Sequence, residues 1–474
     1  MIEKPGPGAG AGSFIGAGRG RHRPCSAPRQ RPPAQPETAT TVTAAVLVPM
    51  LLTLAGAPGA PPDAEPLTLA QALEELDRQS LTLAQARSRA EEAAGVVRQS
   101  AAALLPSLSA GVALLRNSDE AALTLPPQLG DRSVVIQPDA STTWTAGVRV
   151  PLVVPSAWYD LVAAREAARA AGRTSDAVRL TARASLAQTA HAAAAAEELV
   201  AAAERALASA DELVKSAGRR VQAGTAAPLE VTRARAELVR RQSDLAGARA
   251  AVDRARLAAG VMLGRRAPVR IQVPDVEEAP SPELAADASA LVDEGLAHRP
   301  ELDAGEAQRD AAEAGVRGAW ARLAPQLSAS ASVFASEVPY PTGEKDGWRA
   351  TLDLTWQLYD GGWRYGRLRQ ARAQAAGARA ALEAQRLAVA REVLDARREL
   401  EVARERLRLA HAQAELAADS AASIRRSFEA GVASSLDVLD ANDRLFLADS
   451  GLAEARARLA QARLALQLAL GREP

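Results

Sequence analysis

Cysteine, histidine and aromatic residues are scarce in this chain of 474 residues, which has one cysteine, four histidines and 3% aromatic residues. Cys25 stands alone, so the chain can form neither an internal disulfide nor a thiolate metal site. His22, His191, His298 and His411 lie far apart in the sequence. None has a second histidine at metal-ligand spacing. We therefore expect no metal site, no cofactor and no catalytic residues, because no nucleophile, base and orienting group occur together.

An excess of charge of one sign is also missing, because 57 Lys and Arg stand against 57 Asp and Glu. The charges are spread along the chain and form no basic face, which excludes nucleic acid as an expected partner. After residue 57, no stretch of 18 residues is free of charge, so we expect no transmembrane helix in the mature chain. Any contact with a membrane would have to be made by strands.

Residues 1–57 are predicted to be a signal peptide with a low-complexity leader. An arginine-rich part, an apolar run over residues 44–57 and small residues at 55–60 follow the order that export requires. Pro49 and the shortness of the run favour cleavage over a membrane anchor. No cysteine follows the run, so a lipid anchor is not expected. Removal of the leader takes away more basic than acidic residues and leaves a mildly acidic exported chain.

The remaining chain contains an internal duplication. Residues 223–234 resemble residues 430–441 at an offset of 207, and Leu263-Gly264 falls on Leu470-Gly471 at the same offset. This similarity predicts two copies of one unit, residues 58–280 and residues 281–474.

Each copy has the pattern of a very long helix followed by a turn and a second helix. The long helices are predicted over residues 156–217 and 364–428, which contain no proline. At ~1.5 Å per residue, each would be on the order of 90 to 100 Å long. Apolar residues then recur every seven positions, with alanines three positions later: Val438, Leu445, Leu452, Leu459 and Leu466, with Ala441, Ala448, Ala455, Ala462 and Ala469. The first copy keeps this phase at Val231, Leu238, Leu245, Val252 and Ala259, with Ala234, Ala248 and Ala255. These seams predict coiled-coil hairpins.

Four segments alternate between apolar and polar residues, at residues 107–114, 143–152, 326–333 and 348–358. Their length is close to the ~10 residues of a tilted transmembrane strand. Alternation alone would equally predict ordinary half-buried hairpins.

Aromatic placement favours membrane strands. Ten of the 14 aromatic residues lie in residues 144–159 and 334–365, and membrane interfaces favour such amphipathic rings. The expected interface residues are Trp144, Trp158, Trp348, Trp356 and Trp363. Four strands cannot close a barrel, and open edges are not tolerated in lipid, so several protomers must combine. Three chains would supply 12 strands.

Over roughly residues 67–471, the chain resembles the TolC family of outer-membrane efflux factors. The resemblance rests on His298-Arg-Pro-Glu-Leu, Tyr359-Asp-Gly-Gly, the run from Gly431 to Asp440 and the Leu470-Gly471 end. It implies a mixed α and β fold with duplicated coiled-coil hairpins and four transmembrane strands per protomer. It also implies a homotrimer with a 12-stranded barrel in outer-membrane lipid and a helical tunnel in the periplasm. The implied partners are a periplasmic adaptor protein and an inner-membrane transporter.

The family's periplasmic entrance is narrowed by two aspartates, to which Asp437 and Asp440 correspond. Their spacing places both on one helix face. Threefold symmetry would gather six carboxylates, raise some of their pKa values by repulsion and favour cations. Without the resemblance, the same residues would be read as first-turn acids of a helix that Ser434 caps.

Other gate positions depart from the family. Phe428 replaces a tyrosine, Ala433 replaces an arginine and Glu230 replaces an aspartate. The hydrogen bonds that hold the entrance closed in the family must therefore differ in this chain. Gly224 and Gly431 mark hairpin tips that resemble the adaptor contacts. As an alternative, each is a helix C-cap glycine.

These observations predict a passive trimeric duct for efflux of small molecules or metal ions, and not an enzyme. Type I protein secretion is the alternative within the channel class. A soluble periplasmic coiled-coil tether is the alternative from another class, and it would need no detergent.

Overall fold

The structure is a computed structural model that describes residues 66–124, 133–274, 282–340 and 342–474. The predicted signal peptide, with Cys25, lies outside these residues. The expected mixed and helix-rich fold is confirmed. None of the described helices combines the length and apolarity that a membrane span requires. Within the same ranges, no three His, Cys, Asp or Glu side chains gather as metal ligands would.

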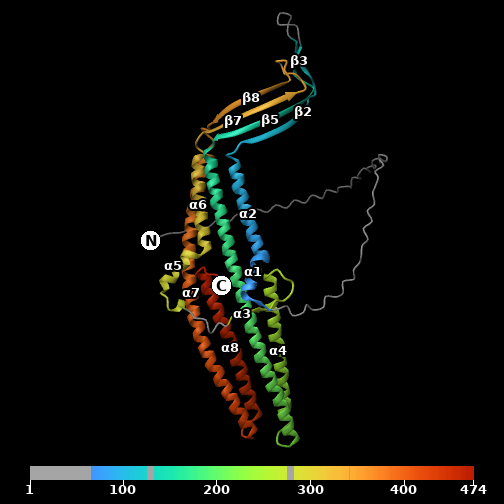
Figure 1. The fold of residues 1–474 in the computed structure, drawn as a ribbon, viewed down its shortest axis with the longest axis vertical. Coiled ribbons are helices and arrows are strands. Elements are labelled where there is room, and N and C mark those ends of the chain that lie inside the picture. Colours follow the sequence, from blue (N-terminus) through green and yellow to red (C-terminus); the bar gives the residue numbers. More distant parts are fainter. Residues whose placement is uncertain (1–65, 125–132, 275–281, 341) are drawn as a thin grey trace, which may run out of the picture. The chain divides into compact units, whose positions relative to one another are not determined.

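Two similar series of elements follow one another along the chain (Figure 1). The first comprises β1 (Leu67–Thr68), α1 (Leu69–Gln79), α2 (Leu81–Ala102), β2 (Ser107–Arg116), β3 (Ala121–Thr124), β4 (Ser133–Gln137), β5 (Ala140–Val153), α3 (Pro155–Gln222) and α4 (Pro228–Met262). The second comprises β6 (Ile271–Gln272), a 3-10 turn (Pro282–Leu284), α5 (Ala288–His298), α6 (Pro300–Ala321), β7 (Gln326–Ser336), β8 (Asp346–Thr355), α7 (Trp363–Glu429) and α8 (Ser435–Ala469). The division into domains at residues 57 and 280 stays a prediction.

The long helices are confirmed and extend slightly beyond the predicted ranges, because α3 has 68 residues and α7 has 67. α3 folds back on α4, and α7 folds back on α8, as two hairpins. Gly224 and Gly431 form the two turns with φ of 72° and 79°, a conformation that residues with a Cβ rarely adopt. Figure 1 shows these turns at the far end of the helices from the main sheet.

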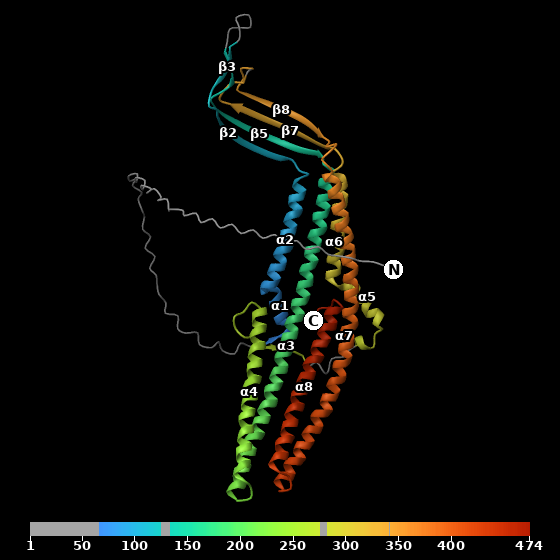
Figure 2. The same ribbon diagram turned by 180° about the vertical axis from the view of Figure 1, so that it is seen from behind.

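The predicted heptad seam lies between the helices of each hairpin. In the second hairpin, Leu400 and Leu407 of α7 are buried in one cluster with Leu459, Leu466 and the alanine line of α8. The alanines between these leucines are small and let the helix backbones approach closely. The two hairpins touch mainly through α3 and α8, which lie side by side in Figures 1 and 2.

A repeated clasp closes the base of each hairpin. Arg265 follows α4 and binds Glu75 of α1 through two hydrogen bonds of 2.5 Å. Arg472 follows α8 and binds Glu294 of α5 through bonds of 2.7 and 3.0 Å. Bidentate pairs of this kind fix orientation as well as distance. The two clasps occupy equivalent positions in the duplicated sequence.

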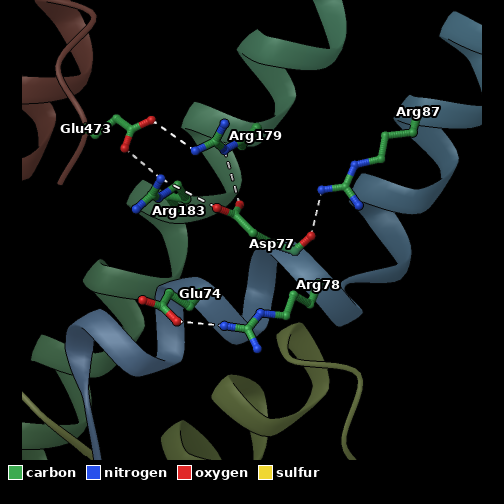
Figure 3. A network of polar contacts seen from close by, with 7 residues as sticks. All are labelled: Glu74, Asp77, Arg78, Arg87, Arg179, Arg183 and Glu473. Atoms are coloured by element: carbon green, nitrogen blue, oxygen red, sulfur yellow. Dashed lines mark hydrogen bonds and ion pairs between the residues drawn. The ribbon is translucent and has the colours of Figure 1, made fainter.

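Beside the first clasp, charged residues tie the end of the chain to α3 (Figure 3). Arg183 lies 2.6 Å from Glu473 and 3.6 Å from Asp77 of α1, and Arg179 lies 3.3 Å from both carboxylates. Arg87 of α2 donates to the carbonyl of Asp77. The network thereby joins α1, α2, α3 and the residues after α8.

The main sheet is antiparallel, with the order β2-β5-β7-β8. β8 ends at Thr355, three residues before the predicted end, because its partner strand β7 begins at Gln326, the residue paired with Thr355. Beyond the strand, the indole N–H of Trp356 donates to the carbonyl of Leu323 at 3.1 Å. Two short pairs, β1 with β6 and β3 with β4, were not predicted because they contain too few residues for a periodic pattern. β2 and β8 are left as the edges of the sheet.

We predict that Gly471→Ala destabilises the fold much more than Gly431→Ala. Both glycines have positive φ, which costs roughly 1–2 kcal/mol for a residue with a Cβ. Only at Gly471 would the new Cβ meet backbone, 2.6 Å from the carbonyl oxygen of His298, whereas Gly431 faces open space. Thermal unfolding followed by circular dichroism measures the difference. Equal losses for the two variants would show that the close approach is not a constraint.

Candidate functional site

The register of the main sheet places most apolar residues of the four strands on one face, whereas Leu115 and Phe334 follow the parity of the other face. Directly paired residues form apolar rows, for example Leu108, Val148, Ala331 and Ala350, and then Ala110, Ala146, Val333 and Trp348. This face is uncovered in the single chain, with Leu108 exposed by 85% and Trp348 by 77%. An apolar patch of this extent on one sheet face is the kind of surface that contacts lipid or another protein.

The opposite face is polar and made mostly of small residues. Its rows contain Ser109, Gly147 and Ser332 beside Arg349, and Ser107, Ser330 and Thr351 beside Arg149. Asp353 lies one row closer to the helices and pairs with Ser328. The sheet therefore has one face suited to lipid and one suited to water, as the alternation predicted.

The five predicted interface tryptophans fall at two levels. Trp144 and Trp348 stand on the apolar face in the half of the sheet near the β7–β8 turn. Trp158 in the first turns of α3, Trp356 after β8 and Trp363 at the start of α7 lie where strands give way to helices. All five are substantially exposed.

Asp437 lies in the first turn of α8, beyond the turn glycine Gly431. Ser434 donates to the Asp437 carboxylate through its backbone N–H and its hydroxyl, both at 2.8 Å. In return, the Asp437 N–H donates to the Ser434 hydroxyl at 3.3 Å, which completes a capping box. The Ser434 N–H, and then the hydroxyl, lower the pKa of the Asp437 carboxyl below its ordinary value because they stabilise the charged form.

Asp440 lies one turn further along α8 and pairs with Arg444 at 2.8 Å. Val438 and Ala441 of the same helix are buried, whereas both aspartates are exposed. The two aspartates thus share an outward face, as their spacing predicted. Glu230 has no ion-pair partner within the described ranges, and it does not share the face of α8 on which Asp437 and Asp440 lie.

Phe428 lies inside the fold rather than beside the aspartates. It is 8% exposed and packs with Leu213 and Ala217 of α3, Ala234 of α4 and Val438 of α8. The guanidinium of Arg220 lies 4.7 Å from its ring centroid. Phe428 therefore contributes to a small core that joins the two hairpins just above their turns.

The turn between α3 and α4 is built differently. Ala227 and Glu230 occupy the positions that Ser434 and Asp437 hold in the second copy, and Ala227 offers no side-chain cap. Pro228 instead begins α4, where its missing N–H needs no partner. Gly224 and Gly431 are both exposed at the ends of their hairpins.

A buried arginine between the hairpins escaped the sequence analysis. Arg241 of α4 is 2% exposed and lies 2.6 Å from Glu237, 3.1 Å from Asp244 and in contact with Asp443 of α8. Its guanidinium also lies 4.7 Å from the ring centroid of Phe446. The sequence does contain a signal for this residue, because Arg241 takes the place of an alanine in the seven-residue repeat between Ala234 and Ala248.

The sequence pattern of the outer membrane efflux protein family matches residues 72–265 and 291–472. No curated protein sequence matches the chain. Among solved structures, the chain is similar to the outer membrane protein VceC of Vibrio cholerae, with 20% identity, a TM-score of 0.70 and coverage of 85% of this chain and 96% of that one. It is also similar to the CmeC outer membrane channel of Campylobacter jejuni, with 16% identity, a TM-score of 0.73 and coverage of 85% of each chain. The MtrE outer membrane channel of Neisseria gonorrhoeae in its open state gives 19% identity, a TM-score of 0.69 and coverage of 85% and 89%.

The capping box predicts a pH-dependent turn. The pKa of Asp437 is lowered in the folded state, so its charged carboxylate stabilises the start of α8. This stabilisation is present above the ordinary carboxyl pKa and is lost as the pH falls through the lowered value. Hydrogen exchange should show protection at the start of α8 near pH 6 that declines towards pH 3. Asp437→Ala should remove this protection at pH 6, whereas Asp440→Ala, which leaves the capping box intact, should keep it. Equal protection in the two variants would contradict the assignment.

Proposed function

The chain belongs to the outer membrane efflux protein family, and from this premise we propose that three copies form a passive export duct through the outer membrane. The observation that carries the proposal is the sheet, most of whose apolar residues lie on one face and whose two edges are open. In lipid, each open edge would leave backbone N–H and C=O groups unpaired. Closure with neighbouring copies removes both edges, and three copies give a barrel of 12 strands.

The tryptophans support this placement. Trp348 and Trp356 are eight residues apart, which is ~26 Å along a strand and less once the strand tilts. Outer-membrane barrels present an apolar band ~25 Å tall between two aromatic girdles. Trp144 and Trp348 would lie at the outer interface, and Trp158, Trp356 and Trp363 at the periplasmic interface.

The outer side of α7 supports contact between copies. Leu387, Leu394, Leu409 and Leu416 form one stripe that is not part of the buried seam, with Leu387 exposed by 73% and Leu416 by 71%. Covering each leucine would contribute about 1.5–3 kcal/mol. We assign this stripe to a neighbouring copy, because closure of the sheet would bring the copies side by side.

The helices would continue the duct into the periplasm, with the hairpin turns as its inner end. At this end, Asp437 and Asp440 would gather as six carboxylates around the threefold axis and attract cations. Glu230 and Phe428 would belong to the same gate region, with Phe428 acting through the packing of the two hairpins. Gly224 and Gly431 would mark the contacts with a periplasmic adaptor, which in turn serves an inner-membrane transporter. The cargo would be small molecules or metal ions.

We predict that the mature protein is extracted only with detergent and has the mass of three chains. Native mass spectrometry of the detergent-extracted protein measures this number. Replacing Leu409 and Leu416 by Gln should shift the mass towards single chains, whereas replacement by Met, which stays apolar, should keep three. A wild-type monomer that is soluble without detergent would instead support the periplasmic tether.

We further predict that Asp437→Asn with Asp440→Asn weakens divalent-cation block and cation selectivity. Asn removes the charge at nearly constant volume and keeps an oxygen that can accept from Ser434. Asp449→Asn is the matched control, because this acid of the same helix is directed at Arg205 of α3, 2.7 Å away. Single-channel recordings with Mg²⁺ added to each side measure both properties. Unchanged block in the double variant would mean that the aspartates serve only as helix-terminal acids.

A further inference from the structure

The polar face of the main sheet carries few charged groups and an excess of basic ones. Along β2, β5, β7 and β8, which are all described, the charged residues on this face are Arg149, Arg349 and Asp353. The other positions are mostly Ser, Thr, Gly and Ala. Each chain therefore presents two guanidinium groups and one carboxylate on the face opposite the apolar one.

The strand register places the two arginines in neighbouring rows of the same face, on β5 and β8. Arg149 pairs with Ser107 on one side and Ser330 on the other. Arg349 pairs with Ser332, in the adjacent row of the same face. Rows that are two residues apart are separated by ~7 Å along the strand, and the intervening strand β7 adds ~10 Å across the sheet. Because their neighbours are small, both arginines extend beyond the surrounding side chains.

Neither guanidinium has an ion-pair partner among the residues that the structure describes, unlike Arg241, Arg265 and Arg472. The hydroxyls of Ser330 and Thr351 form a chain of hydrogen bonds that ends at Asp353 and does not include either arginine. Thr351 donates to Asp353 at 3.0 Å, and Ser330 lies 2.7 Å from the Thr351 hydroxyl. The carboxylate is thus engaged one row away, while both arginines keep their planar forks of donors, which suit carboxylate, sulfonate and phosphate groups.

We propose that Arg149 and Arg349 form an anion-binding belt on the inner wall of the strand region and favour solutes that carry an acidic group. The inference rests on the proposed function, since closure by three copies would place six guanidinium groups against three Asp353 carboxylates around one lumen. The belt has the opposite sign to the acids at the hairpin turns. The duct would therefore contain two selective regions, one at each end.

The test uses the full trimer in planar bilayers, with inorganic triphosphate added to each side in turn. Wild type should be blocked from one side. Replacing both arginines by Gln should raise the half-blocking concentration at least about tenfold, because charge-assisted hydrogen bonds to the anion are lost. Replacing both by Lys, which keeps the charge, should retain most of the block. Asp353→Asn should strengthen it.

Arg116→Gln is the matched control, because this arginine of β2 pairs with Ala140 at the end of the strand and follows the parity of the apolar face. Triphosphate should block the Arg116→Gln channel as strongly as it blocks the wild-type channel. A wild-type channel that conducts without triphosphate block, or a double Gln variant with unchanged block, would overturn the belt and leave the duct intact. A trimer that never conducts would contradict the duct and the belt together.

Discussion

Pairing of backbone hydrogen bonds across the sheet is the constraint on which the rest of this molecule depends. The three strand pairs satisfy the inner strands, β5 and β7, while β2 and β8 each keep one unpaired edge. Water can satisfy such edges, but lipid cannot. The register adds a second demand, because it directs most apolar residues to one side of the sheet and leaves the other side mostly polar. The proposed trimer would meet both demands by closing the sheet with further copies.

The helical part follows different physics, because ion pairs as well as apolar clusters join its two hairpins. Arg241 meets Asp443 between α4 and α8, and Arg456 lies 3.0 Å from Glu198 of α3. Desolvation offsets much of the attraction in a buried ion pair, so Arg241 adds more to the specificity of the contact than to its strength. A polar residue in an otherwise apolar seam is a known way to define which helices pair and in what register. The apolar cluster around Phe428 supplies the complementary contact near the turns.

The two copies show which parts of the unit tolerate change. The clasps of Arg265 with Glu75 and Arg472 with Glu294 are equivalent, because both join the base of a hairpin to a short helix. The turns have diverged, and only the second has a side-chain cap at its helix start. Divergence at the turns is what a duct would need if each hairpin met a different neighbour there.

The sequence by itself determined the elements whose signal is local. The alternation of apolar and polar residues predicts the strands, the long proline-free runs predict α3 and α7, and the seven-residue repeat predicts the seams. Each of these patterns depends only on residues that are close together in the sequence. The family motifs added the position of the turn and its aspartates. Only the tertiary structure decided which distant residues meet. The tertiary structure buries Phe428 and pairs Arg241 with Asp443. It also ends β8 at Thr355, opposite the first residue of β7, and sets Arg149 and Arg349 in adjacent rows. Strand register and long-range ion pairs depend on chain segments tens to hundreds of residues apart, and no local period encodes them.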